Sequence, residues 1–416
     1  MEKPLVCLDI SEGSLKIVIG YNVGGKPVVA YSDSRDVSSY IHDGVIVDKA
    51  GLMAAISDVK EVNDPATHFS ASVSSGICLT VPATGLVIYE MSEVTNVVSP
   101  ENEVARIDVT NLHSKIRKNE MPDGYRIVDI IPDFFVLSNG ERYGNPPVGK
   151  ISPSLSVQAK IHCLPEATYG PISRAIQETG LRVFRRCVAP FCEAEYFKTV
   201  PGLPESYLLV DIGYHQTTVS LIGKGSPYGS VSFYSGGQDL SESIAETLDI
   251  DPISAERLKK EYGYDTRPCS YDAPIIVIAE EDGSKTKHGQ AQLNAAIETF
   301  FEEYGRQLSN AVGTLLVDYK NAHETMPMVI TGGGSSLFGL DTLLGSYFPR
   351  RERFYPEIQT IGARERGFAA CLGMILVASR YSGSLVDDYK GVVNLSRPRT
   401  GTPSKDKKPG IDNDAL

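Results

Sequence analysis

Short apolar runs separated by small polar turns open the chain. Residues 5–10 are apolar except for Asp9, which stands next to last in the run. A turn of small and polar residues follows at 11–14, and further apolar runs follow at 15–19 and 27–31. Apolar runs of this length between turn residues predict three antiparallel strands joined by hairpins.

The same plan recurs about two hundred residues later, so the chain contains an internal repeat. In the second copy Asp211 holds the place that Asp9 holds in the first, at the end of the first run and beside the first turn. The strands of the second unit are expected at 207–212, 217–222 and 230–234, with the first turn at 213–216. Two related halves are therefore predicted.

The remaining periodicity predicts a mixed α/β protein. Ala369, Ala370 and Gly373 are small residues at helical spacing and would let two helices cross closely. Leu385, Val386, Tyr389, Val392 and Val393 form an apolar stripe that predicts a short amphipathic helix, and residues 396–416 are expected to be disordered. Other helices are expected at 92–117, 167–179, 190–198, 240–248, 254–262, 293–318 and 361–379, and other strands at 125–131, 133–137, 154–161, 181–184, 274–279 and 328–331.

Size and charge narrow the class of protein. A chain of 416 residues exceeds what one hydrophobic core usually supports, which again predicts two or more lobes. Lys and Arg number 40 against 52 Asp and Glu, a formal net charge of −12. A dedicated nucleic-acid binder needs a basic face, so this class is disfavoured. ATP stays possible, because backbone N–H groups and a metal ion can hold its phosphates.

Cysteine usage and the N-terminus indicate a reducing, cytosolic environment. The chain has 7 cysteines, an odd number, and no C-x-x-C pair, which argues against a disulfide framework and against a zinc site. Residues 1–4 lead directly into the first apolar run, so we expect no signal peptide. The most apolar stretch, 367–379, is too short to span a bilayer.

The two hairpins are the first candidate for chemistry. Successive N–H groups in a turn of small residues can cradle phosphate oxygens, and two facing hairpins could hold a triphosphate from both sides. Asp9 and Asp211 would then bind Mg²⁺, and Lys16 would neutralise a phosphate. One such hairpin alone is more often an ordinary turn, but two copies in the same register favour the phosphate hypothesis. The other candidate phosphate contacts are Ser11, Gly13, Ser14, Gly213, His215, Thr217 and Thr218.

Two later segments could complete a nucleotide site. Gly332, Gly333, Gly334 and Ser335 follow a short apolar run directly, and glycines allow close approach to an adenosine or an α-phosphate. The alternative is a strand-to-helix turn that needs a single positive φ. Glu256 and Lys259 are three residues apart on a predicted helix, where they could flank a ribose and a base. The alternative there is an ordinary solvated helix face.

Together these motifs resemble the actin/hexokinase/Hsp70 ATPase superfamily and, within it, the FtsA family of actin-like bacterial cell-division proteins. Gly236, Gly237, Asp239 and Leu240, with the run from Ala255 to Gly263, are similar to second-lobe segments of FtsA. Residues 130–137, 145–149 and 157–162 are similar to the extra FtsA subdomain named 1C. The resemblance covers about residues 4–380, as scattered motifs, and adds Gly237 to the expected nucleotide contacts.

The resemblance implies an α/β, actin-like two-lobe fold with an inserted, SHS2-type 1C subdomain and ATP with Mg²⁺ in the cleft. The expected divisions are subdomain 1A at 1–85, 1C at 86–165, 1A again at 166–200, 2A at 201–240, 2B at 241–325, 2A again at 326–358, the last helix of 1A at 359–383, and a short amphipathic segment with a disordered tail at 384–416.

The resemblance also implies a function. FtsA-like proteins assemble with themselves and tether the tubulin-like protein FtsZ to the inner face of the cell membrane at the division site. FtsZ would dock on 2B and later division proteins on 1C, without any nucleic-acid partner. No residue here is well placed as a general base, so at most a slow ATPase is expected. The alternatives are a platform protein of a pilus or secretion system, like PilM, and, more distantly, a sugar or acid kinase.

The chain departs from the family pattern at three places. Ser11 stands where FtsA-like first loops carry Gly, and Tyr214-His215 stand where second loops carry Gly-Gly. Thr218 replaces an acidic residue near the end of the second loop. A bulky pair in a phosphate turn would either crowd the γ-phosphate or supply a substitute contact through His215. The predicted amphipathic helix also adjoins the body of the protein, so membrane attachment is expected to need a partner.

Overall fold

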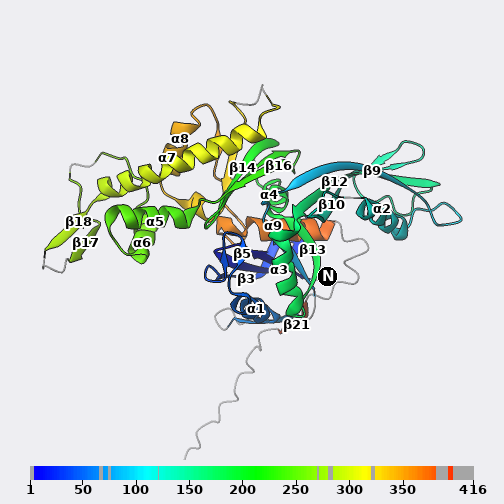
Figure 1. Cartoon of the computed structure of the whole chain (residues 1–416). Coiled ribbons are helices and arrows are strands. Elements are labelled where there is room, and N and C mark those ends of the chain that lie inside the picture. The colour runs from blue at the N-terminus through cyan, green and yellow to red at the C-terminus, as the bar shows by residue number, and fades with distance from the viewer. Residues whose placement is uncertain are drawn as a thin grey trace, which may run out of the picture.

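A computed structural model describes residues 4–64, 69–73, 76–119, 121–268, 271–279, 284–319, 324–380 and 392–396. The molecule has a central body with an arm on each side (Figure 1). Residues from about 87 to 165 form one arm, and residues from 237 to 315 form most of the other. The central body holds two five-stranded sheets, one for each predicted half.

The first sheet has the strand order β13-β8-β1-β2-β3. β1 to β3 form the predicted antiparallel unit, and β8 and β13 extend it as parallel strands. The register places Asp9 opposite Lys16 on one side and Thr80 on the other. The bounds are Leu5–Ile10 for β1, Ser14–Val23 for β2, Lys26–Asp36 for β3, Gly76–Val81 for β8 and Arg182–Val188 for β13.

The second sheet repeats this plan with the order β16-β15-β14-β19-β20. Asp211 lies opposite Thr218 on one side and Thr331 on the other, as Asp9 does in the first sheet. The internal repeat is thus confirmed at the level of strand order and register. The bounds are Ser206–Ile212 for β14, Thr217–Gly223 for β15, Ser226–Phe233 for β16, Met328–Thr331 for β19 and Arg353–Phe354 for β20.

Helices cover the sheets and form much of the second arm. α1 (Lys49–Ser57), α3 (Glu166–Glu178), α4 (Ala189–Phe197) and α9 (Ala369–Arg380) belong to the first half, and α5 (Gly237–Leu248), α6 (Pro252–Glu261), α7 (Gln290–Leu315) and α8 (Leu340–Tyr347) to the second. α4 contacts strands of both sheets, whereas α9 packs on the first sheet and on α4. Short strand pairs complete the structure: β4 (Ile41–His42) with β5 (Val45–Ile46), β6 (Glu61–Asp64) with β7 (Phe69–Val73), and β17 (Ile276–Ala279) with β18 (Lys285–His288).

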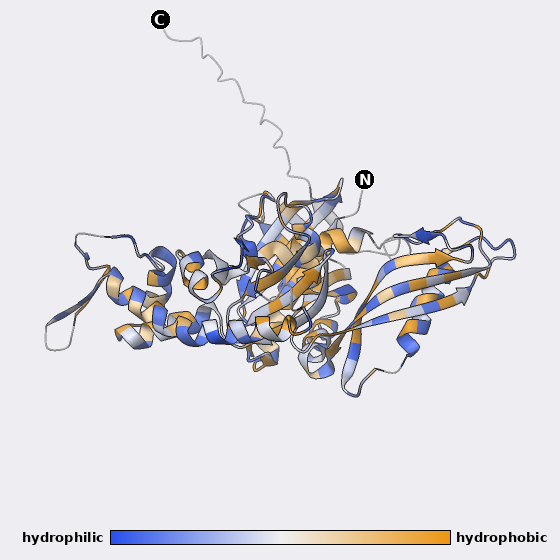
Figure 2. Cartoon of the chain, turned by 90° about the horizontal axis from the view of Figure 1, so that it is seen from above, coloured by the Kyte–Doolittle hydropathy of each residue, from blue (hydrophilic) through white to orange (hydrophobic). Residues whose placement is uncertain are grey.

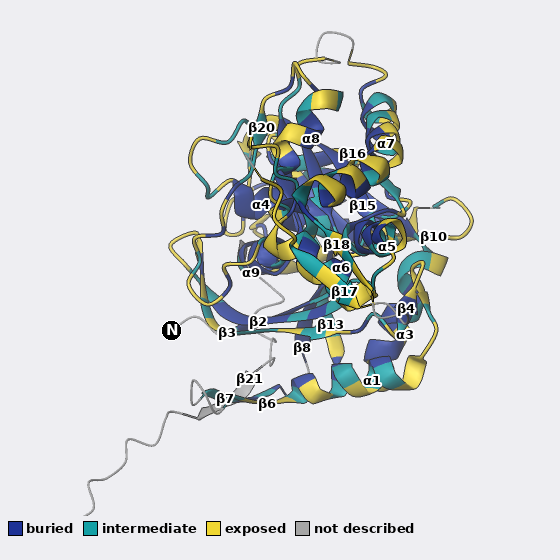
Figure 3. Ribbon diagram, turned by 90° about the vertical axis from the view of Figure 1, so that its left-hand side faces the viewer, coloured by how far each residue is buried: buried dark blue, intermediate teal, exposed yellow. Residues whose placement is uncertain are grey.

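Burial follows the expected apolar pattern. The inner strands of both central sheets are rich in hydrophobic residues (Figure 2), and β1, β8, β14, β15, β19 and α9 are largely buried (Figure 3). The outer strands β3, β13, β16 and β20 are mostly exposed or half-buried. Leu8, Ile17 and Ile375 are fully buried in the first core, and Leu208 and Ile244 in the second. The six cysteines in the described part of the chain are all buried, and none of them is in a disulfide.

The first arm is a separate four-stranded sheet, order β11-β10-β12-β9, with one helix against it. Its own core includes Leu112, Phe135 and Val157, all fully buried. The elements are β9 (Val87–Asn96), α2 (Arg106–Lys118), β10 (Tyr125–Leu137), β11 (Arg142–Tyr143) and β12 (Ser154–Pro165). This arm lies in the segment expected to be inserted.

Two helix predictions were wrong by more than three residues at one end. Residues 92–96 continue strand β9, because they pair with β12, a partner distant in sequence. The helix begins only at Arg106, where the Asp108 side chain accepts from the backbone N–H groups of Ala105 and Val98. Likewise α9 begins at Ala369 and not at 361, because Gly362 has a φ of 90°, which interrupts a helix.

The predicted amphipathic segment also differs. Val392 and Val393 belong to strand β21 (Val392–Ser396), which pairs antiparallel with β7, so the helix prediction was wrong for these two residues. Residues 392–396 form a strand because they pair with the edge of β7, and the local periodicity of this segment carries no information about that partner. The expected disorder was also wrong for Ser396, the last residue of β21, which pairs with Ser70. Leu385, Val386, Tyr389 and the rest of the expected disordered tail, 397–416, lie outside the described residues. In the described part of the chain, no helix is long and apolar enough to cross a membrane.

The predicted close helix crossing is present where α9 meets α4. A Cβ atom on Gly373 would fall on the backbone carbonyl oxygen of Cys192 in α4. The two helices therefore approach at a distance that only glycine permits.

We expect Gly373→Ala to destabilise the protein by about 1–3 kcal/mol or more, because the added methyl group must push two buried helices apart. Gly313→Ala in α7 is the matched control, since a Cβ there meets nothing within 4 Å. Alanine at that position should stabilise the helix by up to about 1 kcal/mol. Urea unfolding measures both. Equal free energies of unfolding for the two variants would show that the helices are not in close contact.

Candidate functional site

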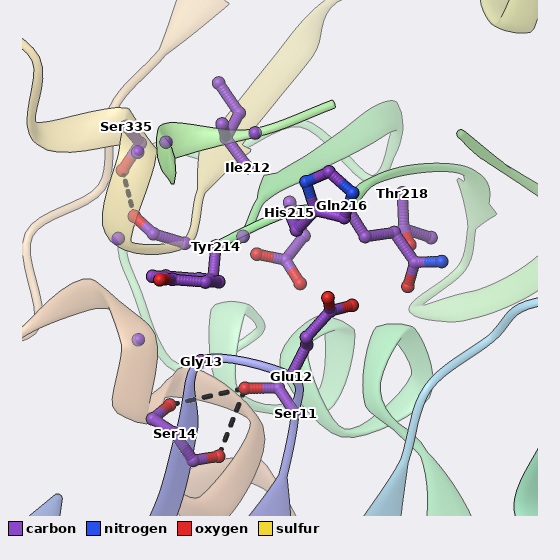
Figure 4. Close-up of a pocket in the computed structure, with 18 of the residues that line it drawn as sticks. Ser11, Glu12, Gly13, Ser14, Ile212, Tyr214, His215, Gln216, Thr218 and Ser335 are labelled. Atoms are coloured by element: carbon purple, nitrogen blue, oxygen red, sulfur yellow. Dashed lines mark hydrogen bonds between the residues drawn. The ribbon is translucent and has the colours of Figure 1, made fainter. Parts of the chain in front are cut away.

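A cleft of about 1380 Å³ lies between the two lobes, and both Asp-bearing hairpins line it. Figure 4 shows the first hairpin facing Tyr214 and His215 of the second across this space. The cleft gathers all but one of the residues predicted to bind a nucleotide: Asp9, Ser11, Gly13, Ser14, Lys16, Asp211, Gly213, His215, Thr218, Gly237, Glu256, Lys259, Gly332, Gly333, Gly334 and Ser335. Segments more than three hundred residues apart in sequence thus share one cavity.

The two hairpin turns have the same geometry. The Ser11 amide donates to the Ser14 carbonyl at 2.9 Å, and the Gly213 amide donates to the Gln216 carbonyl at 2.9 Å. Each turn follows the strand that carries its Asp. Ser14 also accepts from the Lys16 ammonium at 2.8 Å, which draws the lysine toward the turn.

Asp9, Lys16 and Asp211 form a charged group at the base of the cleft. The Lys16 Nζ atom lies 3.5 Å from Asp9 Oδ2, and the Thr80 hydroxyl donates to Asp9 Oδ1 at 2.5 Å. Burial raises the pKa of Asp211 to about 6, while Lys16 lowers it and the Asp9 charge raises it further. The two predicted metal ligands therefore act on each other electrostatically. A single lysine leaves this pair of carboxylates short of positive charge.

Glu193 adds a third carboxyl group that the sequence analysis did not single out. It projects from α4, lines the cleft and is only 4% exposed. Burial raises its pKa well above the ordinary value, and the charges of Asp211 and Asp9 add to this. Its Oε2 atom has no hydrogen-bond partner in the described structure. A glutamate within an apolar helix is the signal that could have identified it.

Tyr214 closes the gap between the two hairpins. A Cβ atom on Gly13 would strike the Tyr214 side chain, so the ring lies directly against the first turn (Figure 4). The loop is held from the other side, because the Gly237 and Gln238 amides donate to the Gly213 and Tyr214 carbonyls at 3.0 and 2.7 Å. The space between the two turns is therefore occupied by the Tyr214 side chain.

The glycine run leaves open space on the other wall. Gly332 has a φ of 82°, and a Cβ there would strike Asp211 and the Ile212 backbone. A Cβ on Gly333 would meet nothing within 4 Å. The run bends into a short 3₁₀ turn, Gly333–Ser336, in which the Ser335 hydroxyl donates to the Gly332 carbonyl at 2.7 Å. Gly332 is buried and a Cβ on Gly334 would strike Ile212, so Gly333 is the point of the run where a ligand can approach the backbone closely.

Glu256 and Lys259 face the cleft, and they do not form a solvated outer surface. Lys259 Nζ lies 2.5 Å from Glu256 Oε2 and donates to the Gly237 carbonyl at 2.6 Å. Burial alone would raise the pKa of Glu256, but hydrogen bonds from Lys259, Ser241 and Lys260 lower it to about 2. The carboxylate is therefore ionised and oriented at the entrance of the cleft.

Thr217 is the exception. Its side chain is fully buried, and its hydroxyl lies 2.7 Å from the Ser235 carbonyl and 3.1 Å from the Tyr304 hydroxyl. The prediction that Thr217 contributes a hydroxyl to phosphate was wrong, because alternation along β15 turns it into the second core. Thr218 faces the cleft and lies 2.9 Å from the Ser232 hydroxyl.

His215 contacts both lobes. Its Nδ1 atom lies 2.7 Å from Asp239 Oδ1, and its Nε2 atom lies 3.1 Å from Asp43 Oδ1 of the first lobe. Burial lowers the pKa of His215, but the carboxylates of Asp239, Glu12 and Asp43 outweigh this, so the pKa lies above its ordinary value. The imidazole is held between carboxylates at the mouth of the cleft.

Comparison with known proteins supports the resemblance to FtsA. Residues 208–373 match the family model "Cell division protein FtsA". FtsA of Enterococcus faecalis is 25% identical over 392 residues, which are 92% of this chain and 84% of that protein. FtsA of Staphylococcus epidermidis is 23% identical over 384 residues, 89% of this chain and 78% of that protein. The resemblance to FtsA proteins inferred from the sequence motifs is confirmed.

Solved structures confirm the actin-like fold. The PilM-PilN type IV pilus biogenesis complex matches with a TM-score of 0.58 and 17% identity, covering 90% of this chain and 98% of that one. MreB5 of Spiroplasma citri, solved bound to ADP, matches with a TM-score of 0.51 and 12% identity, covering 91% of this chain and 96% of that one. These likenesses extend over both lobes and the cleft.

The Glu193→Gln variant should gain stability relative to the parent protein as pH rises from 5 to 8. A carboxyl group whose pKa is raised on folding stabilises the protein at low pH and loses this contribution as pH rises toward the folded pKa. Each unit of pKa shift is worth about 1.4 kcal/mol. The measurement is urea unfolding at several pH values.

Glu246→Gln, on an exposed position of α5, is the control and should leave the pH profile of stability unchanged. Parallel profiles for the parent protein and Glu193→Gln would contradict the burial of an unpartnered carboxyl group at the base of the cleft.

Proposed function

We propose that this chain is an ATP-binding, actin-like scaffold of bacterial cell division that assembles with itself and links FtsZ to the inner face of the cell membrane. The observation that carries the proposal is the pair of matched hairpins that present Asp9 and Asp211 to one cleft. The likeness to FtsA proteins over about nine tenths of the chain adds the cellular role.

The residues of the cleft fit a nucleotide with its metal ion. Asp9 and Asp211 would hold Mg²⁺. Their carboxylates repel each other, and a bound cation would relieve this repulsion. Lys16 and the two turns would contact the phosphates, with the hydroxyls of Ser11 and Ser14 and the amide of Gly13 as donors and Gly213 allowing close approach. The open backbone at Gly333 would face the nucleoside, with Glu256 and Lys259 at the entrance. Bound Mg²⁺ would supply charge neutralisation between phosphate and carboxylates.

ATP in this cleft would act mainly as an assembly ligand. Tyr214 lies where a terminal phosphate would reach between the turns, so the cleft must open there to accept a triphosphate. Asp9 and Asp211 are committed to a cation, and Glu193 is buried beneath them. Hydrolysis is therefore proposed to be slow, and the ligand controls the relative position of the lobes.

Partners would use the two arms. We assign FtsZ to the 2B arm, residues 241–325, and later division proteins to the 1C insert, residues 86–165. The 1A and 2A divisions expected from the sequence complete the two lobes. Peripheral attachment at the division site would be indirect, through a partner or through residues 384–416.

Millimolar Mg·ATP should raise the melting temperature. If ATP binds the folded state with micromolar affinity, a thousandfold excess adds about 4 kcal/mol of stability. Asp211→Ala should abolish the shift, because it removes one of the two carboxylates that face the cation. Asp318→Ala, at an exposed position outside the cleft, should keep it. A shift that survives Asp211→Ala would mean that the cation lies elsewhere.

Co-sedimentation tests the cellular role. The chain should pellet with FtsZ polymers, and it should form filaments whose mass depends on its own concentration and on ATP. Deleting residues 241–325 would disturb the fold, so FtsZ binding is better mapped with charge reversals on exposed side chains such as Lys285 and Lys287. Failure to bind FtsZ while binding a pilus membrane protein would favour the PilM-like alternative. Release of ADP that depends on a sugar or acid acceptor would favour a kinase.

A further inference from the structure

A second group of ligating side chains lies at the mouth of the cleft, apart from Asp9 and Asp211. Glu12, His42 and Asp43 present ligand atoms that all lie within 4.8 Å of one another. His42 Nδ1 is 3.8 Å from Glu12 Oε1 and 3.5 Å from Asp43 Oδ2. His215 reaches this group from the other lobe, and its ring centroid lies 5.8 Å from that of His42.

The contacts of His215 call for a cation. A neutral imidazole carries one N–H group, so only one of its nitrogens can donate. When Nδ1 donates to Asp239 at 2.7 Å, the lone pair of Nε2 faces the Asp43 carboxylate at 3.1 Å. Two acceptors at this distance repel each other unless a proton or a metal ion lies between them. A proton on Nε2 would serve His215 and Asp43 alone. A metal ion at the same place would also be bound by Glu12 and His42.

The backbone fixes this arrangement in advance. Asp43 and Gly44 have φ values of 50° and 71° and form the two-residue turn between β4 and β5. Asp-Gly is a common pair in two-residue hairpin turns, which need a positive φ at both positions. The Asp43 amide donates to Glu12 Oε1 at 3.0 Å, and the Tyr234 hydroxyl of the second lobe donates to the Asp43 carbonyl at 3.2 Å. The hairpin tip is therefore anchored to both lobes.

We propose that Glu12, His42, Asp43 and His215 form a binding site for a divalent transition metal of the zinc class, which joins the two lobes across the mouth of the cleft. Tetrahedral Zn²⁺ with bonds of about 2.0–2.2 Å holds its ligand atoms roughly 3.2–3.6 Å apart. His215 Nε2 and Asp43 Oδ1 are 3.1 Å apart, His42 Nδ1 and Asp43 Oδ2 are 3.5 Å apart, and His42 Nδ1 and Glu12 Oε1 are 3.8 Å apart, which is close to this range. His215 lies outside the group whose ligand atoms are all within 4.8 Å of one another, so its ring would move toward Glu12 and His42 when the metal binds. Two imidazoles with two carboxylates favour Zn²⁺ over Mg²⁺ or Ca²⁺, which prefer oxygen ligands alone.

Asp239 acts as the outer partner of this site. A metal-bound histidine usually donates its other N–H group to a carboxylate, which fixes the ring and its tautomer. His215 has this partner at 2.7 Å, and Asp239 is itself held because it accepts from the Gly236 amide at 2.7 Å. The metal would thus connect the N-terminus of α5 to the hairpin tip of the first lobe and oppose opening of the cleft.

The test uses the full chain, stripped with a chelator and kept free of nucleotide. Titration calorimetry with Zn²⁺ should show one site per chain, and bound Co²⁺ should show the intense visible absorption of a four-coordinate site. His42→Ala in one lobe and His215→Ala in the other should each weaken binding at least tenfold. Asp239→Asn, which keeps an oxygen for the Gly236 amide, should weaken it about 10- to 100-fold.

His288→Ala is the matched control, since it removes a histidine from β18, outside the cluster, and should leave Zn²⁺ affinity unchanged. Unchanged Zn²⁺ affinity in both His42→Ala and His215→Ala would overturn the proposal, and so would six-coordinate Co²⁺. A protein that binds neither ion would also overturn it, and a proton would then lie between His215 and Asp43. Because nucleotide is absent, the result is independent of the proposed ATP binding. If Mg·ATP does not raise the melting temperature but Zn²⁺ still binds, the ATP proposal fails and the metal proposal stands; the reverse result has the opposite meaning.

Discussion

The crossing of α4 and α9 determines where everything else in the cleft can lie. α4 contacts strands of both sheets, and Gly373 lets α9 approach its backbone at the Cys192 carbonyl. The two sheets are therefore held at one separation by a backbone contact that tolerates no side chain. The hairpins after β1 and β14 extend from these sheets, so their distance from each other follows from the helix contact. Glu193 projects from the same helix, one residue after Cys192.

Charge then decides what the cleft can bind. Two carboxylates at equivalent places in two related sheets share one lysine, with a third carboxyl group buried nearby. Such an arrangement is unfavourable when every carboxyl group is ionised, and a proton or a cation relieves it. A phosphate ligand that brings its own Mg²⁺ satisfies the same requirement. The electrostatics of the cleft and the charge of the proposed ligand are thus consistent.

The mouth of the cleft is where this chain differs from the pattern it resembles. Tyr214 packs on Gly13, and His215 joins Asp239 to Asp43, so the two bulky residues in place of glycines add contacts between the lobes. If the contacts of Tyr214 and His215 must break when a ligand enters, they reduce the affinity for that ligand. They also increase the free-energy difference between the open and closed states of the cleft. The proposed scaffold would need such a difference to report a bound nucleotide through its shape.

Local sequence determined the strands and the hairpins, because alternation and turn residues are properties of neighbouring residues. The two aspartates were found by comparing the two copies of the repeat, which needs no tertiary structure. The same is true of the glycine run and of the small residues in α9. The start of α2, the strand β21 and the orientation of Thr217 depended on partners distant in sequence, which pair with or bury a segment whatever its local preference. Glu193 as a site residue and the cluster at Asp43 and His215 could be identified only from the tertiary structure, because each depends on charged groups that come from another part of the chain.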